Sequence, residues 1–538
     1  MDLVEFVKIS RIGGVKLKKA GEKDRIGALC LTSHQMIFSC ESDDPAETYY
    51  KEILHTKVAS VQRTSPTSLR LRLRDFDTIR FGGMTETDAQ KCAETIESLS
   101  QISDAELRYP FYYCPRFTSA VRNGWTMFEI EAEFDRMGCP PNKWRVTKAN
   151  ANYALCETYP KSVIIPKGIE DEGLAKVARF RRDGRFPVLS YYHRSRETAI
   201  LRSSEPLSDH RSREDENHLK AALMPGKRGF IIDTRSHAVA GQRRKSLGGG
   251  GVEIEAHYPH WRRVHCAVAE PSRLASAIEK FVDACLDQTS GMTSWLSRAE
   301  SSNWLSYVCD LLTAACSVAQ CVDRDACTVL IHGSHGVDTT LQVCALAQVL
   351  LDAHARTARG FQALVDREWI RAGHPFADRT AAAAGDPVFL LFLDGVYQVM
   401  RQFPLSFEFN DRLLVFLFDH AHASPFGTFL GNCERSRAQL DVEKRCASLW
   451  SYLDQESVSS ELRNPLYRPH SGALWPSVAA QSFHFWQRLY LKADVGPRPR
   501  TRMDEVIQDA VKERRELDEK LGVLKDELRQ LRESVNKT

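Results

Sequence analysis

The chain has 538 residues, 43% of them hydrophobic and 27% charged, which are ordinary values for a soluble globular protein of two or three domains. The formal net charge of +3 is nearly balanced, so no bulk charge recruits nucleic acid and any electrostatic attraction must be local. The fifteen cysteines are scattered without the paired spacing of a metal site, which indicates free thiols in a reducing compartment and neither a metal ion nor a cofactor.

Targeting signals are not evident in the sequence. The first residues lack a basic stretch followed by a long apolar one, so no secretory signal is expected. The longest apolar runs, 388–393 and 413–418, are far shorter than the ~20 residues that cross a bilayer. We therefore expect a cytosolic protein.

Residues 1–100 are expected to form a small β-rich domain. Two apolar runs, 28–32 and 35–40, flank a polar pair, as the strands of a hairpin would. Residues 69–74 alternate Leu and Arg, a period of two that predicts a half-buried strand with three arginines on its exposed face. A capped helix fits 85–99. Several strands followed by one helix is the pattern of a pleckstrin-homology-like barrel.

Basic side chains cluster at two places in this domain. The candidate lipid-binding residues are Lys16, Lys18, Lys19, Lys23 and Arg25 in one early segment, and Arg70, Arg72 and Arg74 on the alternating strand. A basic patch gains about 1 kcal/mol per residue near an anionic membrane leaflet. The alternative, which the sequence leaves equally open, is a solvated strand face without a ligand.

A large α/β domain is expected to follow. An aromatic-rich connector, 101–119, leads to a region, 120–496, in which strand-like runs alternate with longer helical patterns. The clearest runs are 186–192, 229–233 and 328–332. Alternation of this kind is typical of α/β domains.

One stretch of this region predicts a phosphate-binding turn. Residues 328–343 read Thr-Val-Leu-Ile-His-Gly-Ser-His-Gly-Val-Asp-Thr-Thr-Leu-Gln-Val, an apolar run that passes through two glycines into a helical pattern. Backbone N–H groups and the helix dipole converge at such a turn and favour an anion. The turn nevertheless contains no cysteine, lysine or arginine, so it has neither a nucleophilic thiol nor a cation.

The C-terminal segment, 501–538, is expected to form a coiled coil. From Met503 the seam positions repeat with alternating steps of four and three over more than four heptads. An amphipathic helix packed on the main domain is the alternative. The predicted interface residues are Ile507, Arg514, Leu517, Leu521, Leu524, Leu528, Leu531 and Val535.

Charges beside this seam disfavour a parallel homodimer. The three g-to-e pairs of the assumed register would be Glu513 with Asp518, Lys520 with Lys525, and Glu527 with Arg532. Two of these three pairs repel, and two Arg514 side chains would meet at an a position. We expect pairing with a different chain of complementary charge, while a homodimer and an antiparallel pair stay open.

The turn and several other blocks resemble one known family. Residues 331–342 are similar to the phosphatase loop of the myotubularins, whose active members read V-H-C-S-D-G-W-D-R-T. Blocks similar to family blocks in the same order include Gly184-Arg-Phe-Pro-Val-Leu-Ser-Tyr, Gly373-His-Pro-Phe, Arg401-Gln-Phe-Pro and Gly427-Thr-Phe-Leu-Gly-Asn. The resemblance implies an α/β protein-tyrosine-phosphatase-like domain (120–496), preceded by a β-rich pleckstrin-homology/GRAM domain (1–100) and followed by a C-terminal coiled-coil helix (501–538).

The resemblance also implies a role for each loop position. Gly333 stands where active members carry the nucleophilic cysteine, and Thr339 where they carry the arginine that holds the phosphate by a bidentate fork. His335 replaces the acidic residue proposed to assist proton transfer, and Val337 replaces a tryptophan. The retained residues are His332, Ser334, Gly336, Asp338 and Thr340, which shape the loop. We therefore expect a degenerate, catalytically inactive loop.

Other side chains substitute poorly for the missing thiol. Cys327 lies roughly 20 Å back along the strand, and Cys344 roughly 9 Å into the following helix. Ser334 is near enough but lacks an activating base and a cation, and a phosphohistidine at His335 is a further alternative. Whether the backbone amides still bind a head group stays open. Asp338 is expected to cap the following helix.

These observations predict a pseudophosphatase that acts as a regulatory or adaptor subunit. The resemblance implies pairing through 501–538 with an active myotubularin that dephosphorylates phosphatidylinositol 3-phosphate or the 3,5-bisphosphate. The chain would raise that partner's activity, stability or membrane targeting, and would be cytoplasmic and peripherally associated with endosomal or other endomembranes. The alternative is a stand-alone phosphoinositide-binding protein without catalysis.

Overall fold

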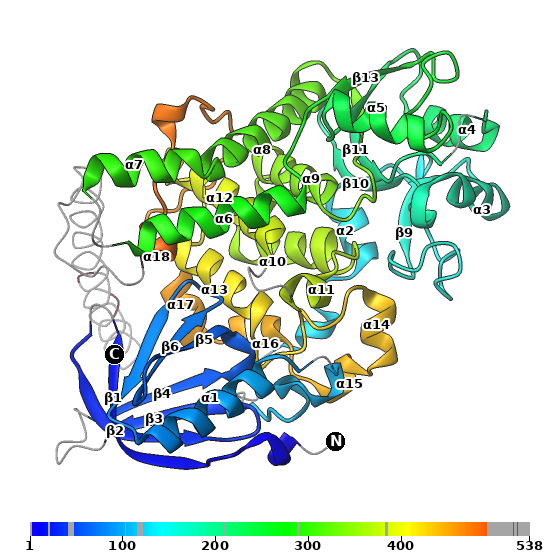
Figure 1. Ribbon diagram of the computed structural model, residues 1–538. Coiled ribbons are helices and arrows are strands. Elements are labelled where there is room, and N and C mark those ends of the chain that lie inside the picture. Colours follow the sequence, from blue (N-terminus) through cyan, green and yellow to red (C-terminus); the bar gives the residue numbers. More distant parts are fainter. Residues whose placement is uncertain are drawn as a thin grey trace, which may run out of the picture.

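The computed structural model describes residues 3–19, 22–40, 48–102, 104–115, 122–207, 210–287, 291–381 and 386–491, together with Lys520 and Lys525. A sheet with one helix, built from the N-terminal residues, lies beside a larger body of helices and strands (Figure 1). The predicted coiled coil, 501–538, and all of its predicted interface residues lie outside the described residues, of which only Lys520 and Lys525 belong to that segment.

The N-terminal sheet has seven antiparallel strands in the order β4-β3-β2-β1-β7-β6-β5. The elements are β1 (Arg11–Lys19), β2 (Arg25–Leu31), β3 (Gln35–Cys40), β4 (Tyr49–Leu54), β5 (Val58–Ser65), β6 (Ser68–Leu73), β7 (Thr78–Gly82) and α1 (Glu86–Ser100). The predicted hairpin is confirmed, because β2 pairs directly with β3. The predicted helix is also confirmed, and Thr85 caps it by accepting a hydrogen bond from Asp88 N at 3.1 Å.

The larger body contains a five-stranded sheet in the order β10-β11-β14-β12-β13. Its strands are β10 (Val188–His193), β11 (Thr198–Ser203), β12 (Gly229–Asp233), β13 (Trp261–His265) and β14 (Thr328–His332), and β8 (Trp144–Thr147) pairs separately with β9 (Val163–Pro166). Only the edge pair β10–β11 of the larger sheet is antiparallel. The strands predicted at 229–233 and 328–332 are confirmed. All five residues of β14 are buried, as a central parallel strand requires.

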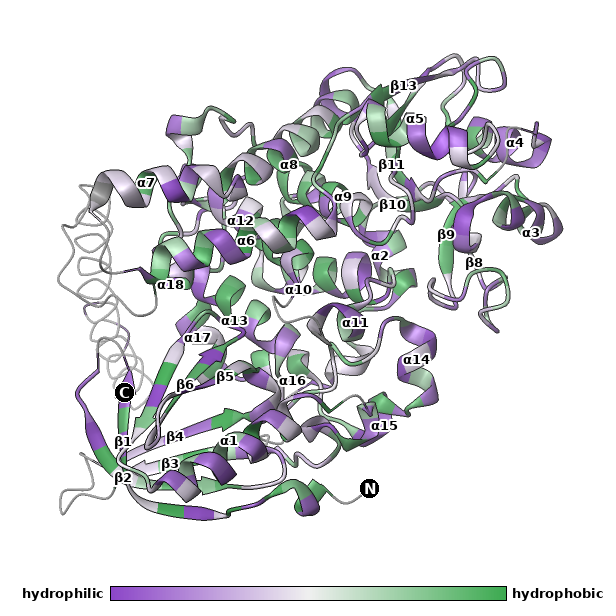
Figure 2. Ribbon diagram, viewed as in Figure 1, coloured by the Kyte–Doolittle hydropathy of each residue, from purple (hydrophilic) through white to green (hydrophobic). Residues whose placement is uncertain are grey.

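Helices surround this sheet. They are α2 (Ile130–Arg136), α3 (Asp171–Phe180), α4 (Arg213–Ala222), α5 (His237–Ser246), α6 (Pro271–Leu286), α7 (Met292–Ser301), α8 (Trp304–Ala319), α9 (Thr339–Leu351), α10 (Ala358–Val365), α11 (Phe376–Ala381), α12 (Pro387–Gln402), α13 (Asp411–His422), α14 (Glu434–Gln439), α15 (Val442–Arg445), α16 (Leu449–Leu453), α17 (Glu456–Leu462) and α18 (Gln487–Tyr490). Nearly all of α9 is buried against β11, β14, α8 and α12. The outlying helix α4 carries mostly hydrophilic residues (Figure 2). The centre of the body is therefore α9 and its neighbours.

One described helical stretch is long and apolar enough to cross a membrane by length and composition. It comprises Trp304–Arg324, with a mean hydropathy of 1.5 in its most apolar window. Its helix α8 contacts α9 and α12, and its buried residues belong to the hydrophobic core. A buried core helix of a globular body meets the same criterion.

The prediction that Arg74 lies on the exposed face of an alternating strand is wrong. β6 ends at Leu73, and the chain then turns through Phe76, whose φ is +68°. Arg74 is only 9% exposed, and its Nε donates a hydrogen bond to Thr56 O at 3.1 Å. The alternation of side chains holds only while a strand continues, so it does not extend to Arg74.

The same turn joins the N-terminal sheet to the larger body. The ring of Phe76 is centred 5.4 Å from that of Phe418 in α13 and 5.9 Å from that of Tyr490 in α18. Phe76 is 9% exposed and belongs to the core of the larger body. On the other side of the sheet, Arg72 Nη2 lies 2.8 Å from Asp283 Oδ1 in α6. The two parts therefore share a packed boundary.

Candidate functional site

The loop between β14 and α9, residues 333–338, follows the central strand of the sheet. The strand register places Ser203 of β11 and Asp233 of β12 beside His332 of β14. The carboxyl ends of three parallel strands therefore meet at the loop, which is where such sheets usually bind ligands.

Gly333 begins the loop, and two threonine hydroxyls occupy the space beside it. A Cβ at position 333 would lie 2.8 Å from both Thr234 Oγ1 and Thr339 Oγ1. The two hydroxyl oxygens are 2.6 Å apart, and Thr234 Oγ1 donates to His332 O at 3.2 Å, so Thr339 donates to Thr234. A side chain at position 333 would require these threonines to move.

Gly336 makes the sharp turn of the loop with a φ of +74°. A Cβ there would lie 2.5 Å from Ser203 O, so both the backbone conformation and the available space require glycine. The buried Arg185 donates from Nη2 to Gly336 O at 2.8 Å and to Ala372 O at 2.9 Å. Its guanidinium thus holds the loop by backbone carbonyls.

His335 and Ser334 lie on the open side of the loop. The His335 side chain is 50% exposed, and its Nδ1 lies 3.0 Å from Asp183 Oδ2. This hydrogen bond holds the pKa of the Asp183 carboxyl below its usual value. The Ser334 carbonyl accepts from Glu205 N at 3.2 Å. No described residue hydrogen-bonds to the Ser334 hydroxyl, so in this part of the chain no base adjoins it.

Asp338 directly precedes α9, but the prediction that it caps the helix is wrong. Its side chain makes no capping hydrogen bond. Instead Oδ2 accepts from Arg379 Nη2 of α11 at 2.6 Å, and Oδ1 lies 3.6 Å from Nδ1 of the buried His374. Burial opposes a charge on His374, but the carboxylates of Asp386 and Asp338 outweigh it and raise the His374 pKa. The Asp338 carboxylate therefore contacts Arg379 and His374 and does not bond to the N–H groups at the start of α9.

Behind the loop, His332 belongs to a buried chain of charged groups. His332 Nε2 lies 3.0 Å from Glu253 Oε2, and Glu253 Oε1 accepts from Arg181 Nη1 at 2.6 Å. Arg181 also makes a bidentate pair with Asp215, at 2.9 and 2.7 Å. Burial alone would raise the Glu253 pKa and lower that of His332, but their mutual attraction, assisted by Arg181 at Glu253, reverses both shifts. The chain of pairs supports the end of β14.

A second buried carboxylate, Glu205, gathers three arginines near the loop. It accepts from Arg182 Nη1 at 2.8 Å, from Arg243 Nη2 at 2.6 Å and from Arg235 Nη1. Arg235 also pairs with both oxygens of Asp233, at 2.8 Å each. Positive charge beside the loop is thus compensated within the protein, as buried charges generally are.

Comparison with known proteins identifies the family of the region that holds this strand–loop–helix arrangement. The family model described as a myotubularin-like phosphatase domain matches residues 108–438. The chain belongs to the myotubularin family. It is 42% identical to myotubularin-related protein 9 of Homo sapiens over 545 residues, which cover 99% of this chain and 98% of the relative. It is 38% identical over 521 residues to the protein of the same name from Caenorhabditis elegans, with coverage of 91% and 90%.

A further relative is named for its activity. The chain is 32% identical over 550 residues to the phosphatidylinositol-3,5-bisphosphate 3-phosphatase MTMR6 of Homo sapiens, with coverage of 98% of this chain and 87% of the relative. The family predicted from the sequence is therefore confirmed.

The two cysteines that precede and follow the loop in this myotubularin lie away from it. Cys327 comes before the first residue of β14, at the opposite end of the strand from Gly333, and Cys344 is buried within α9. Burial raises the pKa of both thiols above the usual value. Neither thiol is placed or activated to act at the loop.

The basic residues predicted to bind lipid lie in three settings. Lys18, Lys19, Arg70 and Arg72 line one pocket of about 540 Å³ between the sheet and α6. Four of the eight form ion pairs with Asp24, Glu22 or Asp77, namely Lys16, Lys18, Lys19 and Arg25. Lys23 is exposed, and Arg74 lies in a separate cleft. The eight residues do not form one continuous patch.

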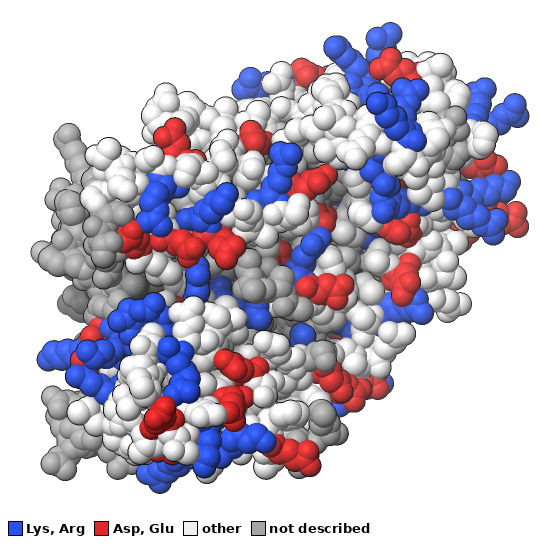
Figure 3. All heavy atoms as spheres, in the orientation of Figure 1, with Lys and Arg blue, Asp and Glu red and all other residues white. Residues whose placement is uncertain are grey.

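Arg80 of β7 lies at the centre of the pocket residues, and the sequence interpretation missed it. Register pairs Lys18 with Arg80 and Arg80 with Arg70, so three cations stand side by side on adjacent strands. Because three cations are adjacent, this row concentrates positive potential. Like charges directly opposite each other also destabilise a sheet. Blue side chains gather over this sheet, and red ones over the α6 region beside it (Figure 3). The alternation of β7, Thr-Ile-Arg-Phe-Gly, is the sequence signal that could have identified Arg80.

Proposed function

We propose that this chain is a catalytically inactive myotubularin that serves as a regulatory subunit of an active one. The observation that carries the proposal is position 333, where glycine offers no nucleophile and the hydroxyls of Thr234 and Thr339 fill the adjoining space. Covalent phosphoryl transfer requires a nucleophile and cationic groups at the transferring phosphate. Thr339 supplies no cation, and Arg182, Arg235 and Arg243 are already paired with Glu205 or Asp233.

The proposed partner is an active myotubularin, bound through 501–538. Heptad spacing supports a coiled coil, and its like-charged g-to-e pairs favour a different chain over a second copy. A relative named as a phosphatidylinositol-3,5-bisphosphate 3-phosphatase supports 3-phosphorylated phosphoinositides as the partner's substrates. The complex would be cytoplasmic and would associate with endosomal or other endomembranes.

The proposed regulation works through the membrane surface. We assign the N-terminal sheet to the pleckstrin-homology/GRAM class, and its row of Lys18, Arg80 and Arg70 supports contact with an anionic leaflet. A second membrane-binding module raises the effective concentration of the active subunit at its lipid substrate. A bound partner also stabilises the folded state by mass action.

The association is tested by co-purification of an active myotubularin with the full-length chain. We expect Leu528→Glu, at a seam position, to abolish co-purification, and the matched Arg529→Glu, one residue outside the seam, to leave it intact. Retention of the partner by Leu528→Glu and by a chain ending at residue 500 would contradict the coiled-coil interface.

A second function, stand-alone phosphoinositide binding, is favoured by the same row of cations. It predicts that a chain ending at residue 500 binds phosphoinositide vesicles as strongly as the full-length chain. Arg80→Glu, which reverses the central charge of the row, should weaken that binding by about tenfold or more, and Arg11→Glu, at an exposed position of β1 outside the pocket, should not. Vesicle binding by the truncated chain, with no partner on the full-length chain, would favour this function.

A further inference from the structure

The end of helix α5 carries an exposed serine next to three basic side chains. Residues 243–248 read Arg-Arg-Lys-Ser-Leu-Gly, and Ser246 is the last residue of the helix, which lies at one edge of the larger body (Figure 1). Ser246, Arg244 and Lys245 are all exposed. After Leu247 the chain continues into four glycines, 248–251. The proposed function uses none of these exposed side chains.

We propose that Ser246 is phosphorylated by a protein kinase that recognises arginines before its acceptor residue. In this reaction Ser246 Oγ forms a bond to the γ-phosphorus of ATP, and the bond from that phosphorus to the bridging oxygen of ADP breaks. The hydroxyl proton passes to the catalytic carboxylate of the kinase, and ADP leaves. Kinases of this class select substrates by their charge pattern, because carboxylates beside the active site pair with the guanidinium groups of the substrate.

The spacing of the arginines distinguishes Ser246 from the other hydroxyl groups of the chain. It is the one serine or threonine in the sequence with arginine both two and three positions before it. Leu247 adds an apolar residue directly after it. Ser301, by comparison, has Arg298 three positions before it but Ala299 two positions before it. The pair of arginines therefore selects Ser246.

The end of α5 can adopt the extended form that a kinase binds. Of the ten residues of α5, all of which the structure describes, Ala240 alone is buried. Gly241 lies inside the helix and lowers its stability by about 1 kcal/mol relative to alanine. A helix this short is marginal without tertiary packing. Its last turn can therefore open locally while the core stays folded.

One ion pair opposes this opening, and its loss leaves no buried charge unpaired. Arg243 donates to Glu205 Oε1 from Nη2 at 2.6 Å and from Nε at 3.2 Å. Glu205 also accepts from Arg182 and Arg235. If Arg243 leaves, the buried carboxylate keeps two guanidinium partners, so the large penalty of an unpaired buried charge does not arise.

A phosphate on Ser246 would stabilise the open form. It carries a charge of about −1.5 to −2 at pH 7, which is unfavourable at the C-terminus of a helix because the dipole is negative there. It also offers Arg243 a new partner, since residues three apart lie on the same face of a helix. Ser246 Oγ already lies 2.9 Å from Arg243 O. Because Glu205 N donates to Ser334 O at 3.2 Å, the phosphate would draw Arg243 from a residue that contacts the loop.

The test incubates the full-length chain with MgATP and the catalytic subunit of cyclic-AMP-dependent protein kinase, which serves as a probe of this kinase class. Mass spectrometry measures the phosphate at each serine and threonine. We expect Ser246 to be modified first, and Ser246→Ala to remove this phosphate. Arg244→Gln should slow the initial rate at Ser246 at least tenfold, because the exposed Arg244 can pair with the kinase. Thermal unfolding of each variant establishes that the fold is intact.

Ser301→Ala is the matched control. Ser301 is also the exposed last residue of a ten-residue helix, α7, and its Oγ donates to Arg298 O at 2.9 Å. This variant should incorporate phosphate at Ser246 at the native rate. Faster modification of Ser301 than of Ser246, the absence of phosphate at Ser246, or a rate at Ser246 that does not depend on Arg244 would each overturn the assignment.

Hydrogen exchange tests the effect of the phosphate on α5. The amides of residues 244–251 should exchange at least several-fold faster in the phosphorylated chain than in the unmodified chain. Arg243→Gln in the unmodified chain should also accelerate this exchange, because it removes the contact with Glu205. Exchange that phosphorylation leaves unchanged would contradict the transfer of Arg243 from Glu205 to the phosphate.

Discussion

Two glycines determine what the loop between β14 and α9 can accommodate, and they do so for different reasons. Gly336 combines a φ of +74° with a Cβ position 2.5 Å from Ser203 O, so the backbone itself excludes other residues. Gly333 has an ordinary φ, and the atoms nearest to its Cβ position are the hydroxyl oxygens of Thr234 and Thr339, each at 2.8 Å. The first glycine shapes the loop, whereas the second leaves a reactive position without a side chain.

Replacing Gly336 by alanine should destabilise the protein by about 3 kcal/mol, because a backbone contact adds to the cost of the left-handed conformation. The matched control is Gly226→Ala, since Gly226 has a φ of +73° but no heavy atom within 4 Å of its Cβ position. The free energy of unfolding of that variant should fall by only about 1 kcal/mol. Urea unfolding measures both, and equal losses would mean that the contact with Ser203 O is readily relieved.

A cysteine introduced at position 333 should be a poor nucleophile. In Gly333→Cys the Cβ meets Thr234 Oγ1 and Thr339 Oγ1, and no arginine adjoins the thiol at position 339 to favour the thiolate. Adding Thr339→Arg removes one hydroxyl and introduces a cation, so the double variant should be alkylated several-fold faster at residue 333. Mass spectrometry of the peptide that contains residue 333 reads out the rate. Equal rates in the two variants would contradict this explanation of the loop.

The buried pair of His332 and Glu253 predicts a particular dependence of stability on pH. The folded-state pKa of His332 is raised. Its contribution to the free energy of unfolding is therefore complete below its unfolded-state pKa of about 6.5, and is lost as the pH rises through its folded-state pKa. The pKa of Glu253 is lowered, so its contribution is lost only in acid, as the pH falls toward the folded value. The stability advantage of the native chain over His332→Gln should therefore shrink as the pH rises above about 6.5. Unfolding free energies that run parallel over this range would contradict the pairing.

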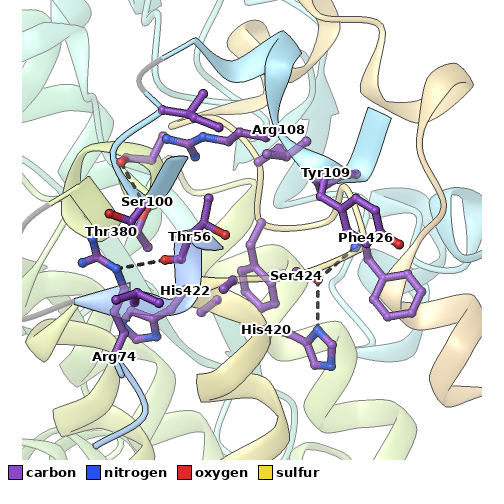
Figure 4. A pocket seen from close by; sticks show the side chains of 18 of the residues that line it. Thr56, Arg74, Ser100, Arg108, Tyr109, Thr380, His420, His422, Ser424 and Phe426 are labelled. Carbon is purple, nitrogen blue, oxygen red and sulfur yellow. Dashed lines mark hydrogen bonds between the residues drawn. The ribbon is translucent and has the colours of Figure 1, made fainter. Parts of the chain in front are cut away.

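Among the elements, the turn between β6 and β7 has the largest structural consequence. Its Phe76 leaves the N-terminal sheet and packs against α13 and α18, while the following strand carries Arg80 to the opposite face. The same turn places Arg74 in the wall of a cleft of about 590 Å³ that Arg108 also lines (Figure 4). One short connection thus positions the boundary between the two parts.

Phe76→Ala should therefore weaken the attachment of the N-terminal sheet. Loss of a buried aromatic ring costs about 3–5 kcal/mol, and this ring adjoins Phe418 and Tyr490. Tyr50→Ala is the control, because Tyr50 lies on the same sheet but is 58% exposed, and it should change stability by less than about 0.5 kcal/mol. Urea unfolding and limited proteolysis of the connector compare the two. A similar result for both variants would mean that Phe76 does not hold the boundary.

At the scale of the whole molecule, the sequence predicts what is local. β12 and β14 are continuous apolar runs rich in β-branched residues, and α1 begins at a capping threonine, so short windows contain the signal. The loop is also contiguous, from Gly333 to Asp338, which is why its position could be recognised. The coiled coil at 501–538 remains a prediction from heptad spacing alone.

Contacts between distant segments could not be read in the same way. Thr234 meets Thr339 across 105 residues of sequence. Glu205 pairs with Arg235, which follows β12, and with Arg243 of α5, and no sequence motif indicates either pair. Arg74 was misplaced because its strand ends one residue earlier than the alternation suggests. Asp338 stands at a capping position but meets Arg379, whose approach depends on how α11 packs. These details follow from tertiary structure.

We propose that the chain performs no catalysis itself and regulates a partner through its C-terminal segment. The most direct measurement is phosphate release from phosphatidylinositol 3-phosphate vesicles by an active myotubularin, alone and with one equivalent of this chain. We predict no release by the chain alone, a faster rate when the full-length chain is added, and no acceleration by a chain ending at residue 500. Release by the purified chain alone, or equal acceleration by the truncated chain, would contradict the account.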